Sequence, residues 1–261
     1  MKIATWNVNS VGARLPHLMR WIQEDAPDVA LLQEIKCVSE AFPYETIEDM
    51  GYNVVAFGQK SYNGVAILSK FPLEDVTRGL PTFEQDTQAR YIEAVTNGVR
   101  VASIYVPNGS EVGSDKFSYK MAFYGALGDH AAQSLSYGEP LVWGGDYNVA
   151  PYAQDMHDPA LSGEPRILCS VEEQRALRTL ISQGFCDGLR QVFPATQEAG
   201  KGLFSWWDYR AGSFNRNKGF RIDHLLLSPQ ASDRLEAAGI DAHTRGWERP
   251  SDHAPVWITL V

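Results

Sequence analysis

The hydrophobic pattern of the chain is dominated by short apolar runs that end in polar residues. The run from Asp28 to Gln33 follows Pro27, and its length and composition are typical of a buried strand. Glu34 therefore lies at a predicted strand end. Comparable strands are predicted at Lys2–Val8, Tyr52–Phe57, Val65–Ser69, Tyr91–Val95, Val99–Tyr105, Leu141–Trp143, Ile222–Leu227 and Val256–Leu260.

Three other segments repeat apolar residues at helical intervals. The spacing predicts a helix over Leu15–Asp25 and longer helices over Lys116–Ser134 and Val171–Gln183. The last of these follows Ser170, and Glu173 three residues later completes a capping-box pattern. Because strands often follow one another without an intervening helix, the pattern favours two packed mixed β-sheets flanked by helices over an all-parallel sheet.

Length and composition indicate one folded domain. A chain of 261 residues fits a single α/β domain that spans residues 1–261. Hydrophobic residues make up 44% of it and charged residues 21%, which is enough apolar surface for a substantial core. Its three cysteines form no CxxC pair, so neither a disulfide framework nor a zinc site is expected. With no secretory signal and no membrane-length apolar stretch, we expect a cytoplasmic protein without a membrane partner.

The local distribution of charge changes the picture that net charge gives. A formal net charge of -9 argues against a polyanionic partner. Between Lys201 and Arg221, however, five basic residues accompany a single acid, Asp208. With its interleaved aromatics this stretch is typical of a nucleic-acid-binding surface, and equally of an aromatic core with solvated charges. Its basic and aromatic members are Lys201, Phe204, Trp206, Trp207, Tyr209, Arg210, Phe214, Arg216, Lys218, Phe220 and Arg221.

Acids and amides collect where the predicted strands end. They are Asn7 and Asn9 after IATW, Glu34 after LLQ, Asp146 and Asn148 after VWGG, Asp223 in RID, and Asp252 with His253 before APVW. Strand ends of this kind meet at one edge of the sheets, where a ligand crevice forms. Carboxylates gathered there repel one another unless a hard cation binds or one carboxylate takes up a proton. Magnesium is the simplest cation that fits.

A set of motifs resembles the exonuclease III branch of the endonuclease/exonuclease/phosphatase superfamily. Across nearly the whole chain they run in the order TWNVNS, LLQEIK, YNGVAILSK, IYVPNG, GGDYNVAP, FSWWDYR, GFRIDHLL and PSDHAPV. The resemblance implies a four-layered α/β sandwich with the active site at one end. It also implies a Mg2+-dependent hydrolase, with Mn2+ as a substitute, that repairs duplex DNA. Such enzymes cut at abasic sites, as AP endonucleases, or act at 3′ ends as 3′-5′ exonucleases and 3′-phosphatases.

The resemblance further implies a metal site and a charged histidine. Glu34 matches the principal metal ligand of the family, with Asn9 and Asp252 as nearby metal-site groups. His253 matches the histidine that contacts the scissile phosphate, and Asp223 matches the carboxylate that pairs with it. Taken singly, each of these residues fits a surface acid or a partner in a structural hydrogen bond equally well. The functional interpretation therefore depends on the motifs in which they lie.

Four more residues match contacts to the reacting groups. Asp146 corresponds to the residue that activates the attacking water or protonates the leaving group, and the sequence leaves both tasks open. Asn148 beside it would orient that group and the phosphate. Asn7 and Tyr105 match neutral donors to the phosphate or the leaving group, although Tyr105 also suits a strand cap.

The DNA-facing residues implied by the resemblance come from the basic and aromatic stretch. Trp206, Phe220 and Ile222 match the apolar lining of the pocket that receives a flipped-out abasic deoxyribose. The same three residue types are also typical of the hydrophobic core of a β-rich protein. Arg216 and Lys218 lie in the adjoining loop, which would touch the DNA backbone or enter a groove.

The segment Asp155–Leu168 is expected to border the pocket. Members of the family differ in whether they mainly cut at abasic sites or act at 3′ ends. We expect this segment to set that balance, with Pro165, Arg166 and Leu168 narrowing the groove.

Two other functional classes fit the sequence less well. A non-catalytic binding relative would have lost metal and histidine motifs that are complete here. A phosphodiesterase for lipids or inositides is not expected to carry FSWWDYR followed by GFRID. We interpret Arg90 as part of a structural ion pair and the two lysines Lys116 and Lys120 as a solvated helix face. None of the three is expected to contact the phosphate. We expect a monomer that acts on nucleoid DNA.

Overall fold

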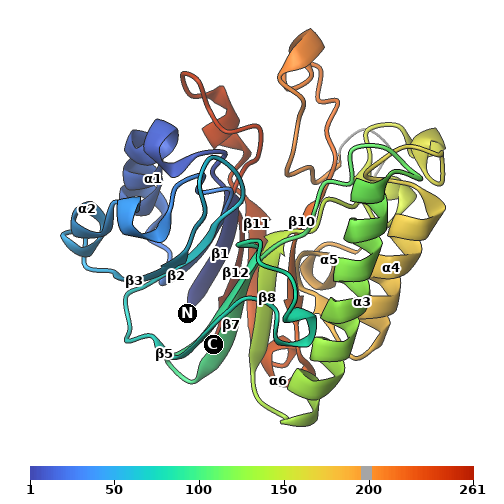
Figure 1. The fold of residues 1–261 in the computed structure, drawn as a ribbon. Coiled ribbons are helices and arrows are strands. Elements are labelled where there is room, and N and C mark those ends of the chain that lie inside the picture. Colours follow the sequence, from blue (N-terminus) through green and yellow to red (C-terminus); the bar gives the residue numbers. More distant parts are fainter. Residues whose placement is uncertain (195–201) are drawn as a thin grey trace.

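Two mixed β-sheets form the centre of the computed structural model, which describes residues 1–194 and 202–261 (Figure 1). The strand order is β11-β12-β1-β2-β4-β3 in the first sheet and β5-β6-β7-β8-β10-β9 in the second. The first sheet contains β1 (Lys2–Asn7), β2 (Val29–Gln33), β3 (Asn53–Phe57), β4 (Val65–Ser69), β11 (Leu235–Ile240) and β12 (Val256–Leu260). The second contains β5 (Glu74–Arg78), β6 (Tyr91–Thr96), β7 (Val99–Tyr105), β8 (Leu141–Asp146), β9 (Cys186–Asp187) and β10 (Asp223–Leu227). Strand β1 runs parallel to β2, and β7 runs parallel to β8.

The inner faces of the two sheets bury a shared apolar core. Leu31 and Ile67 of the first sheet belong to the same fully buried cluster as Val142 and Leu225 of the second. Gly144 of β8 also lies here, and a Cβ atom at this position would come 2.6 Å from Leu31 Cδ1. The sheets therefore approach closely along β8, one of the strands that end at the candidate site.

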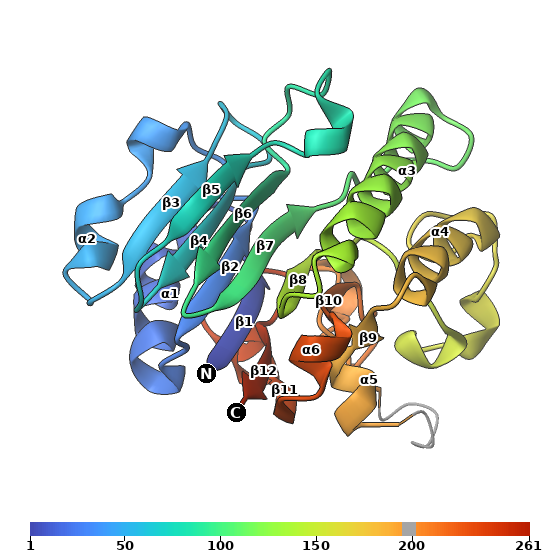
Figure 2. The same ribbon diagram turned by 90° about the horizontal axis from the view of Figure 1, so that it is seen from below.

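Helices cover the outer faces of both sheets, which gives the four layers that the sequence predicts (Figures 1 and 2). Helices α1 (Val11–Asp25) and α2 (Tyr44–Glu48) cover the first sheet, and α3 (Asp115–Ser136) and α4 (Val171–Ser182) cover the second. The shorter α5 (Gly188–Val192) and α6 (Pro229–Ser232) pack against β10. Within the described ranges, no helix has both the length and the apolar character needed to cross a membrane.

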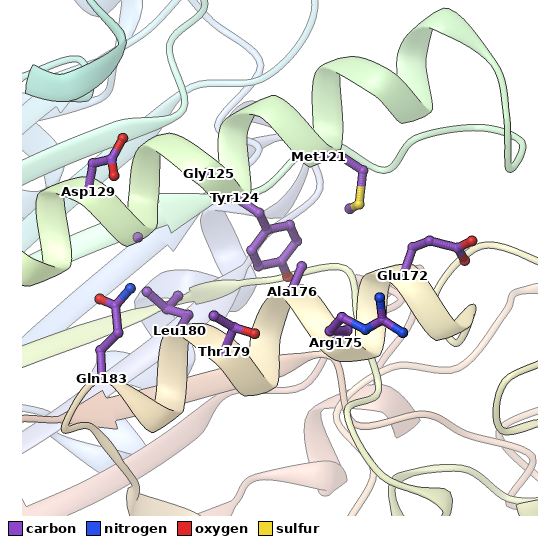
Figure 3. A pocket seen from close by; sticks show the side chains of 11 residues that line it. Met121, Tyr124, Gly125, Asp129, Glu172, Arg175, Ala176, Thr179, Leu180 and Gln183 are labelled. Carbon is purple, nitrogen blue, oxygen red and sulfur yellow. The ribbon is translucent and has the colours of Figure 1, made fainter.

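Helices α3 and α4 lie side by side, with a groove of about 390 Å³ between them (Figure 3). Met121, Tyr124 and Arg175 are among the residues that line it. The Tyr124 hydroxyl donates to the Tyr147 carbonyl at 2.7 Å, which ties α3 to the segment after β8. None of the predicted site residues lines this groove, so it is not the crevice that the sequence predicts.

Most predicted elements are confirmed, with shifted ends and a few omissions. The predicted strand Leu141–Trp143 continues to Asp146, and the predicted helix Leu15–Asp25 begins at Val11. The capping box of α4 is present, because Ser170 and Glu173 bond each other's backbone amides. Three strands were not predicted. Strand β5 is mostly polar and exposed, β9 has two residues, and β11 is an edge strand of small residues, so none of them has a long apolar run.

One member of the basic stretch is an internal residue. Arg221 is fully buried, and its guanidinium lies 2.8 Å from Asp155 Oδ1 and 2.7 Å from Asp187 Oδ2. Arg190 also contacts Asp155. This ion-pair cluster joins β9 and α5 to the segment after β8, so Arg221 cannot contact DNA as its place in the stretch suggested. Lys201, another member, lies outside the described residues.

The buried cluster predicts how stability depends on pH. Burial raises the pKa of Asp187, but the charge of Arg221 outweighs burial and holds that pKa well below its ordinary value. A depressed folded-state pKa stabilises the protein at pH values above about 4, the unfolded pKa, and this stabilisation is lost as the pH falls through the folded pKa. Replacing Asp187 by Asn should therefore lower the free energy of unfolding at pH 7 and flatten its decline below about pH 5.

Urea unfolding at pH 7 and at pH 3 measures this effect. Asp75→Asn is the matched control, because Asp75 pairs with Arg100 at 2.9 Å but keeps 65% of its side chain exposed. Equal pH dependence in the two variants would contradict a stabilising role for the buried pair.

Candidate active site

The candidate active site is a cavity of about 150 Å³ at one end of the sandwich, where strands of both sheets end. The loop around the 3-10 turn Arg210–Gly212, drawn in orange, projects from the top of the molecule in Figure 1. The cavity is lined by Glu34, Tyr105, Asn108, Asp146, Asn148, Leu168, Trp206, Ile222, Asp252 and His253. Most of the residues predicted from strand ends thus lie around one small space.

Asn7 joins the two sheets at this end. Its side-chain amide donates to Glu34 Oε1 at 2.8 Å and to Asp146 Oδ2 at 2.9 Å. Asn7 is the last residue of β1, and Glu34 directly follows β2 of the same sheet. Asp146 is the last residue of β8, which belongs to the other sheet. Because the Asn7 side chain is fully buried, its two N–H groups hold these carboxylates together without adding charge.

Two of the three predicted metal-site residues contact a positive charge. The ammonium of Lys36 lies 2.8 Å from Glu34 Oε2 and 2.5 Å from Asn9 Oδ1. Asn9 Nδ2 in turn donates to Asp252 Oδ1 at 2.9 Å. Carboxylate and amide oxygens are the ligands that hard divalent cations prefer, so the donor set of Glu34, Asn9 and Asp252 fits such an ion.

Both carboxylates of this group stay ionised. Burial raises the pKa of Glu34, but the Lys36 charge and the Asn7 hydrogen bond lower it by more than burial raises it. The resulting pKa lies below its ordinary value. Burial likewise raises the pKa of Asp252, which the charge of His253 and the Trp206 hydrogen bond bring below its ordinary value. A low pKa keeps each oxygen free to bind a cation at neutral pH.

His253 lies between two carboxylates. Its Nδ1 is 2.9 Å from Asp223 Oδ2, and its Nε2 is 3.7 Å from Asp146 Oδ2. Burial lowers the pKa of His253, but Asp223 and then Asp146 outweigh burial and raise that pKa to about 10. The Ser205 hydroxyl donates to Asp223 Oδ2 at 2.6 Å and accepts from two backbone amides, which fixes the carboxylate. The ring is thus positively charged at neutral pH.

The pKa of Asp146 is shifted in the opposite direction to that of Glu34. Burial, reinforced by the charges of Asp223 and Glu34, raises its pKa to about 7, although His253 opposes the rise. The backbone amide of Asn148 donates to Asp146 Oδ1 at 2.9 Å, which orients the carboxylate. Carboxyl groups whose pKa values are pushed apart in this way can divide acid–base and electrostatic tasks between them.

Tyr105 faces the cavity with its hydroxyl protonated. Burial, with the charges of Glu34 and Asp146, raises its pKa well above the ordinary value, so the phenol is a neutral donor. The Arg90 guanidinium lies 4.8 Å from the centre of the Tyr105 ring and donates to its carbonyl at 3.3 Å. Arg90 is buried and supports Tyr105, but its partners among the described residues are neutral groups such as Gln88 and Tyr105, so the expected ion pair is not found there.

The apolar wall of the cavity differs in one respect from the prediction. Trp206 and Ile222 line it, but Phe220 is not among the lining residues and packs behind Trp206 with the ring centres 5.9 Å apart. Leu168 also lines the cavity, whereas Pro165 and Arg166 are exposed outside it.

The predicted DNA-facing cations and one helix lysine lie apart from the cavity. Arg216 and Lys218 are exposed in the projecting loop. Lys116 lines a neighbouring groove of about 570 Å³, which shares Tyr105 and Asn108 with the cavity. The expectation that Lys120 lies on a solvated helix face is wrong, because the residue is fully buried.

Several residues of the site were not singled out from the sequence. Lys36 ends the LLQEIK motif and Asn108 lies in IYVPNG, so the motifs contained a signal for both. Ser205 lies in FSWWDYR, so that motif contained the same kind of signal for it. Tyr209 donates to the Pro250 carbonyl at 2.8 Å, a contact across the chain that no local pattern indicates.

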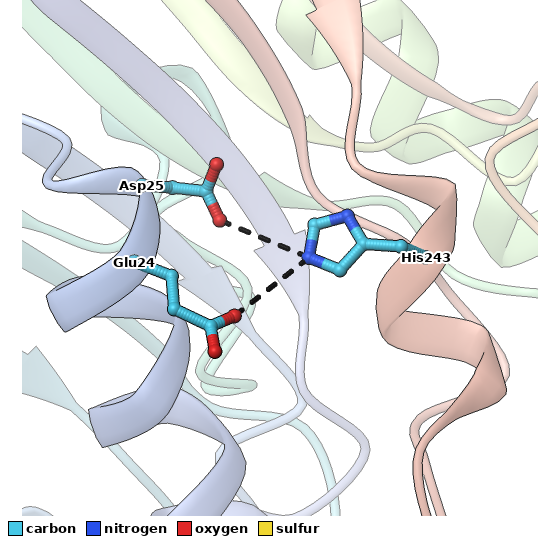
Figure 4. A group of neighbouring side chains, drawn as sticks. All are labelled: Glu24, Asp25 and His243. Atoms are coloured by element: carbon cyan, nitrogen blue, oxygen red, sulfur yellow. Dashed lines mark ion pairs between the residues drawn. The ribbon is translucent and has the colours of Figure 1, made fainter.

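A second group of acids and histidine lies elsewhere on the described part of the molecule (Figure 4). Nε2 of His243 is 4.0 Å from both Glu24 and Asp25. Glu24 and His243 are exposed, and the group lies at the far end of α1, roughly 20 Å along the helix from the cavity. It therefore takes no part in the site.

Known proteins are similar to this chain in fold and sequence. The Endonuclease/Exonuclease/phosphatase family matches residues 4–253. The chain is 36% identical to Exodeoxyribonuclease III of Haemophilus influenzae, with 98% of each protein covered. The structure of the 3′ phosphatase NExo from Neisseria bound to a product DNA hairpin is 40% identical, with a TM-score of 0.95 and 100% and 99% of the two chains covered. An AP endonuclease from Archaeoglobus fulgidus is 34% identical, with a TM-score of 0.93 and the same coverage.

The contacts of His253 generate a prediction about its titration. Replacing Asp223 by Asn removes the main group that raises the pKa of His253 from its ordinary value to about 10, while burial remains. The pKa should therefore fall markedly, as followed by NMR of the imidazole in metal-free protein. Ser205→Ala is the control, because it keeps the Asp223 carboxylate and should leave the pKa high. A value near 10 in both variants would contradict the assigned cause.

Proposed function

The chain belongs to the Endonuclease/Exonuclease/phosphatase family and to its exonuclease III branch, and from this premise we propose how its residues hydrolyse DNA. It is a DNA repair nuclease of the hydrolase class. The observation that carries the assignment of residues is the convergence of acids, amides and one histidine from distant segments on a single cavity. We propose that the protein acts as a monomer on duplex DNA; a cytoplasmic location stays a prediction.

We propose that Glu34, Asn9 and Asp252 hold the metal ion, Mg2+ by preference with Mn2+ as a substitute. The family is metal-dependent, and the low pKa values of Glu34 and Asp252 support ligation at neutral pH. A bound divalent cation would polarise a phosphoryl oxygen and stabilise charge on the leaving oxygen. The position of the Lys36 ammonium supports a preference for positive charge here.

The neutral and cationic donors would bind the phosphate. His253, charged through its contact with Asp223, would place Nε2 against a phosphate oxygen and stabilise the negative charge that builds up there. Asn7, Asn148 and the Tyr105 hydroxyl would donate to the phosphate or the leaving oxygen. Neutral donors can follow that charge without adding another full charge to the site.

Asp146 is proposed to accept the proton of the attacking water. Its pKa of about 7 is matched to that task at neutral pH, whereas Glu34 stays ionised. The water oxygen forms a bond to phosphorus, the bond from phosphorus to the leaving oxygen breaks, and that oxygen takes up a proton from solvent. Asn148 would keep Asp146 oriented through its backbone amide.

The small volume of the cavity favours a small substrate group against its apolar wall. A space of about 150 Å³ beside Trp206 and Ile222 suits a sugar without a base, or the terminal group of a 3′ end, better than a stacked nucleotide. We propose that Phe220 stiffens this wall from behind and that Arg216 and Lys218 touch the DNA backbone. Leu168, which lines the cavity, would favour 3′ ends over abasic sites.

Labelled duplexes test the proposed function. One carries an abasic analogue, one a 3′ phosphate and one a recessed 3′ end, each incubated with Mg2+, with Mn2+ or with a chelator. Incision, phosphate release and laddering report the three activities separately. Absence of all three with either metal would exclude a catalytic role, and activity in chelator would exclude the metal site.

His253→Asn should lower kcat by about 10²- to 10⁴-fold, because the charged donor to the phosphate is lost. Circular dichroism should show a folded protein. The exposed histidine of the second group supplies the control, since His243→Asn should keep the parental rate. Parental turnover in the His253 variant would refute its contact with the phosphate.

Glu34→Ala should raise the concentration of Mg2+ needed for half-maximal activity, because the principal metal ligand is lost. Calorimetric titration of the DNA-free protein with Mn2+ gives a second readout that does not depend on catalysis. Glu24→Ala, in an exposed acid remote from the cavity, should bind metal like the parent. Equal metal affinity in both variants would remove Glu34 from the metal site.

Leu168→Ala should raise abasic-site incision relative to 3′ phosphate release by about tenfold or more, the usual effect of side-chain bulk in a binding pocket. Arg166→Ala is the control, because that side chain is exposed and does not line the cavity. An unchanged ratio in the Leu168 variant would show that other features set substrate choice.

A further inference from the structure

Lys120 is a fully buried lysine directly behind the catalytic cavity. Its ammonium donates to Glu173 Oε1 at 2.5 Å, to the Asn148 carbonyl at 2.8 Å and to the Asn108 carbonyl at 3.2 Å. All three of its N–H groups therefore have a partner. The acceptors come from three separate segments, after β7, after β8 and at the start of α4.

A fully buried ion pair contributes little net stability to a protein core. Taking an ammonium and a carboxylate out of water costs free energy that their attraction only partly offsets, and an apolar pair of the same size is often as stable. The Lys120–Glu173 pair therefore is not explained by stability alone. What it provides is a fixed position for the carbonyl groups that it binds.

The residue that depends most on this position is Asn148. Its backbone has φ of 51°, in the left-handed region that side-chain-bearing residues rarely adopt. Lys120 holds its carbonyl directly, and it also holds Asn108, whose Nδ2 donates to Asn148 Oδ1 at 3.1 Å. The Asn148 side chain continues the chain of contacts, because its Nδ2 donates to Asp146 Oδ2 at 3.3 Å and to the Val106 carbonyl at 2.9 Å.

Two neighbouring features fit the same arrangement. Gly109 has φ of 91°, and a Cβ atom there would lie 3.1 Å from Lys120 Cδ, so the absence of a side chain leaves room for the lysine stem. Glu173 Oε1 also accepts from the backbone amide of Leu168 at 3.1 Å. The pair thus reaches a second residue of the cavity wall.

We propose that Lys120, paired with Glu173, is a positioning residue that holds the Asn148 side chain, and through it Asp146, in the geometry needed for hydrolysis. The inference rests on the proposed roles of Asn148 and Asp146. Lys120 touches neither substrate nor metal, and it acts through the two carbonyl groups that it binds.

The first test is Lys120→Met, which keeps the length of the side chain and removes its donors. Glu173 then still accepts from the Leu168 amide, the Ser170 amide and the Ser170 hydroxyl, so its charge keeps three hydrogen bonds. With a duplex carrying a 3′ phosphate, kcat should fall by about 10- to 100-fold, the range found when a group that orients site residues is lost. KM for DNA should change by less than about twofold, because no substrate contact is removed.

A double-mutant cycle separates positioning from general structural damage. In an Asn148→Ala background there is no Asn148 side chain to hold, so adding Lys120→Met should change kcat by less than about twofold. If Lys120 served only the fold, the two losses would multiply. Multiplicative losses, or an unchanged kcat in folded Lys120→Met, would overturn the inference.

Arg100→Met is the matched control. Arg100 pairs with the buried Glu93 at 3.1 Å, and Glu93 keeps the Tyr91 hydroxyl as a donor after the change. Arg100 lies near the start of β7, at the opposite end from Tyr105. This variant should lose stability but keep the parental kcat when both are assayed below their unfolding transitions.

If Lys120→Met does not fold, Lys120→Met with Glu173→Gln removes both charges, and the single carbonyl oxygen of Gln can still accept from the Ser170 amide and hydroxyl. The same loss of kcat and the same non-additivity with Asn148→Ala are expected, and parental kcat would overturn the inference. An inactive parent protein on all three duplexes would instead mean that the proposed function fails. The two failures are therefore distinguishable.

Discussion

The site depends on the two N–H groups of a single buried amide. Asn7 binds Glu34 within its own sheet and Asp146 across the sandwich. Carboxylates brought this close in a buried space repel each other, and neutral donors reduce that repulsion without introducing a charge that would compete with a metal ion. The close approach of the sheets at Gly144 is what lets one side chain reach both partners.

The same space contains groups with opposite electrostatic tasks. Glu34 and Asp252 stay ionised beside positive charge, whereas burial among other acids raises the pKa of Asp146 to about 7. His253 remains charged because Asp223 lies against one ring nitrogen. A nuclease needs metal ligands that stay ionised and one group that exchanges protons, and these neighbours differ enough in environment to provide both.

Behind the cavity, buried ion pairs connect segments that the sheets alone would leave separate. Arg221 joins β9 and the segment after β8, and Lys120 joins α3 and α4 to the loops that carry Asn108 and Asn148. Neither residue could be assigned from its sequence context. Both are basic residues in stretches that also suit a solvated or DNA-binding surface, and only burial distinguishes these cases.

The sequence by itself determined the strands with long apolar runs, the helices with regular spacing and the acids at strand ends, because hydrophobic periodicity and motif order are local properties. Strand β5 does not follow from the pattern, because it is mostly polar and exposed and lacks an apolar run. Only the tertiary structure decided which side chains meet. Whether Phe220 lines the pocket or packs behind Trp206, and whether Lys120 is solvated or buried, depends on segments far apart in the chain and on the low dielectric that packing creates around them.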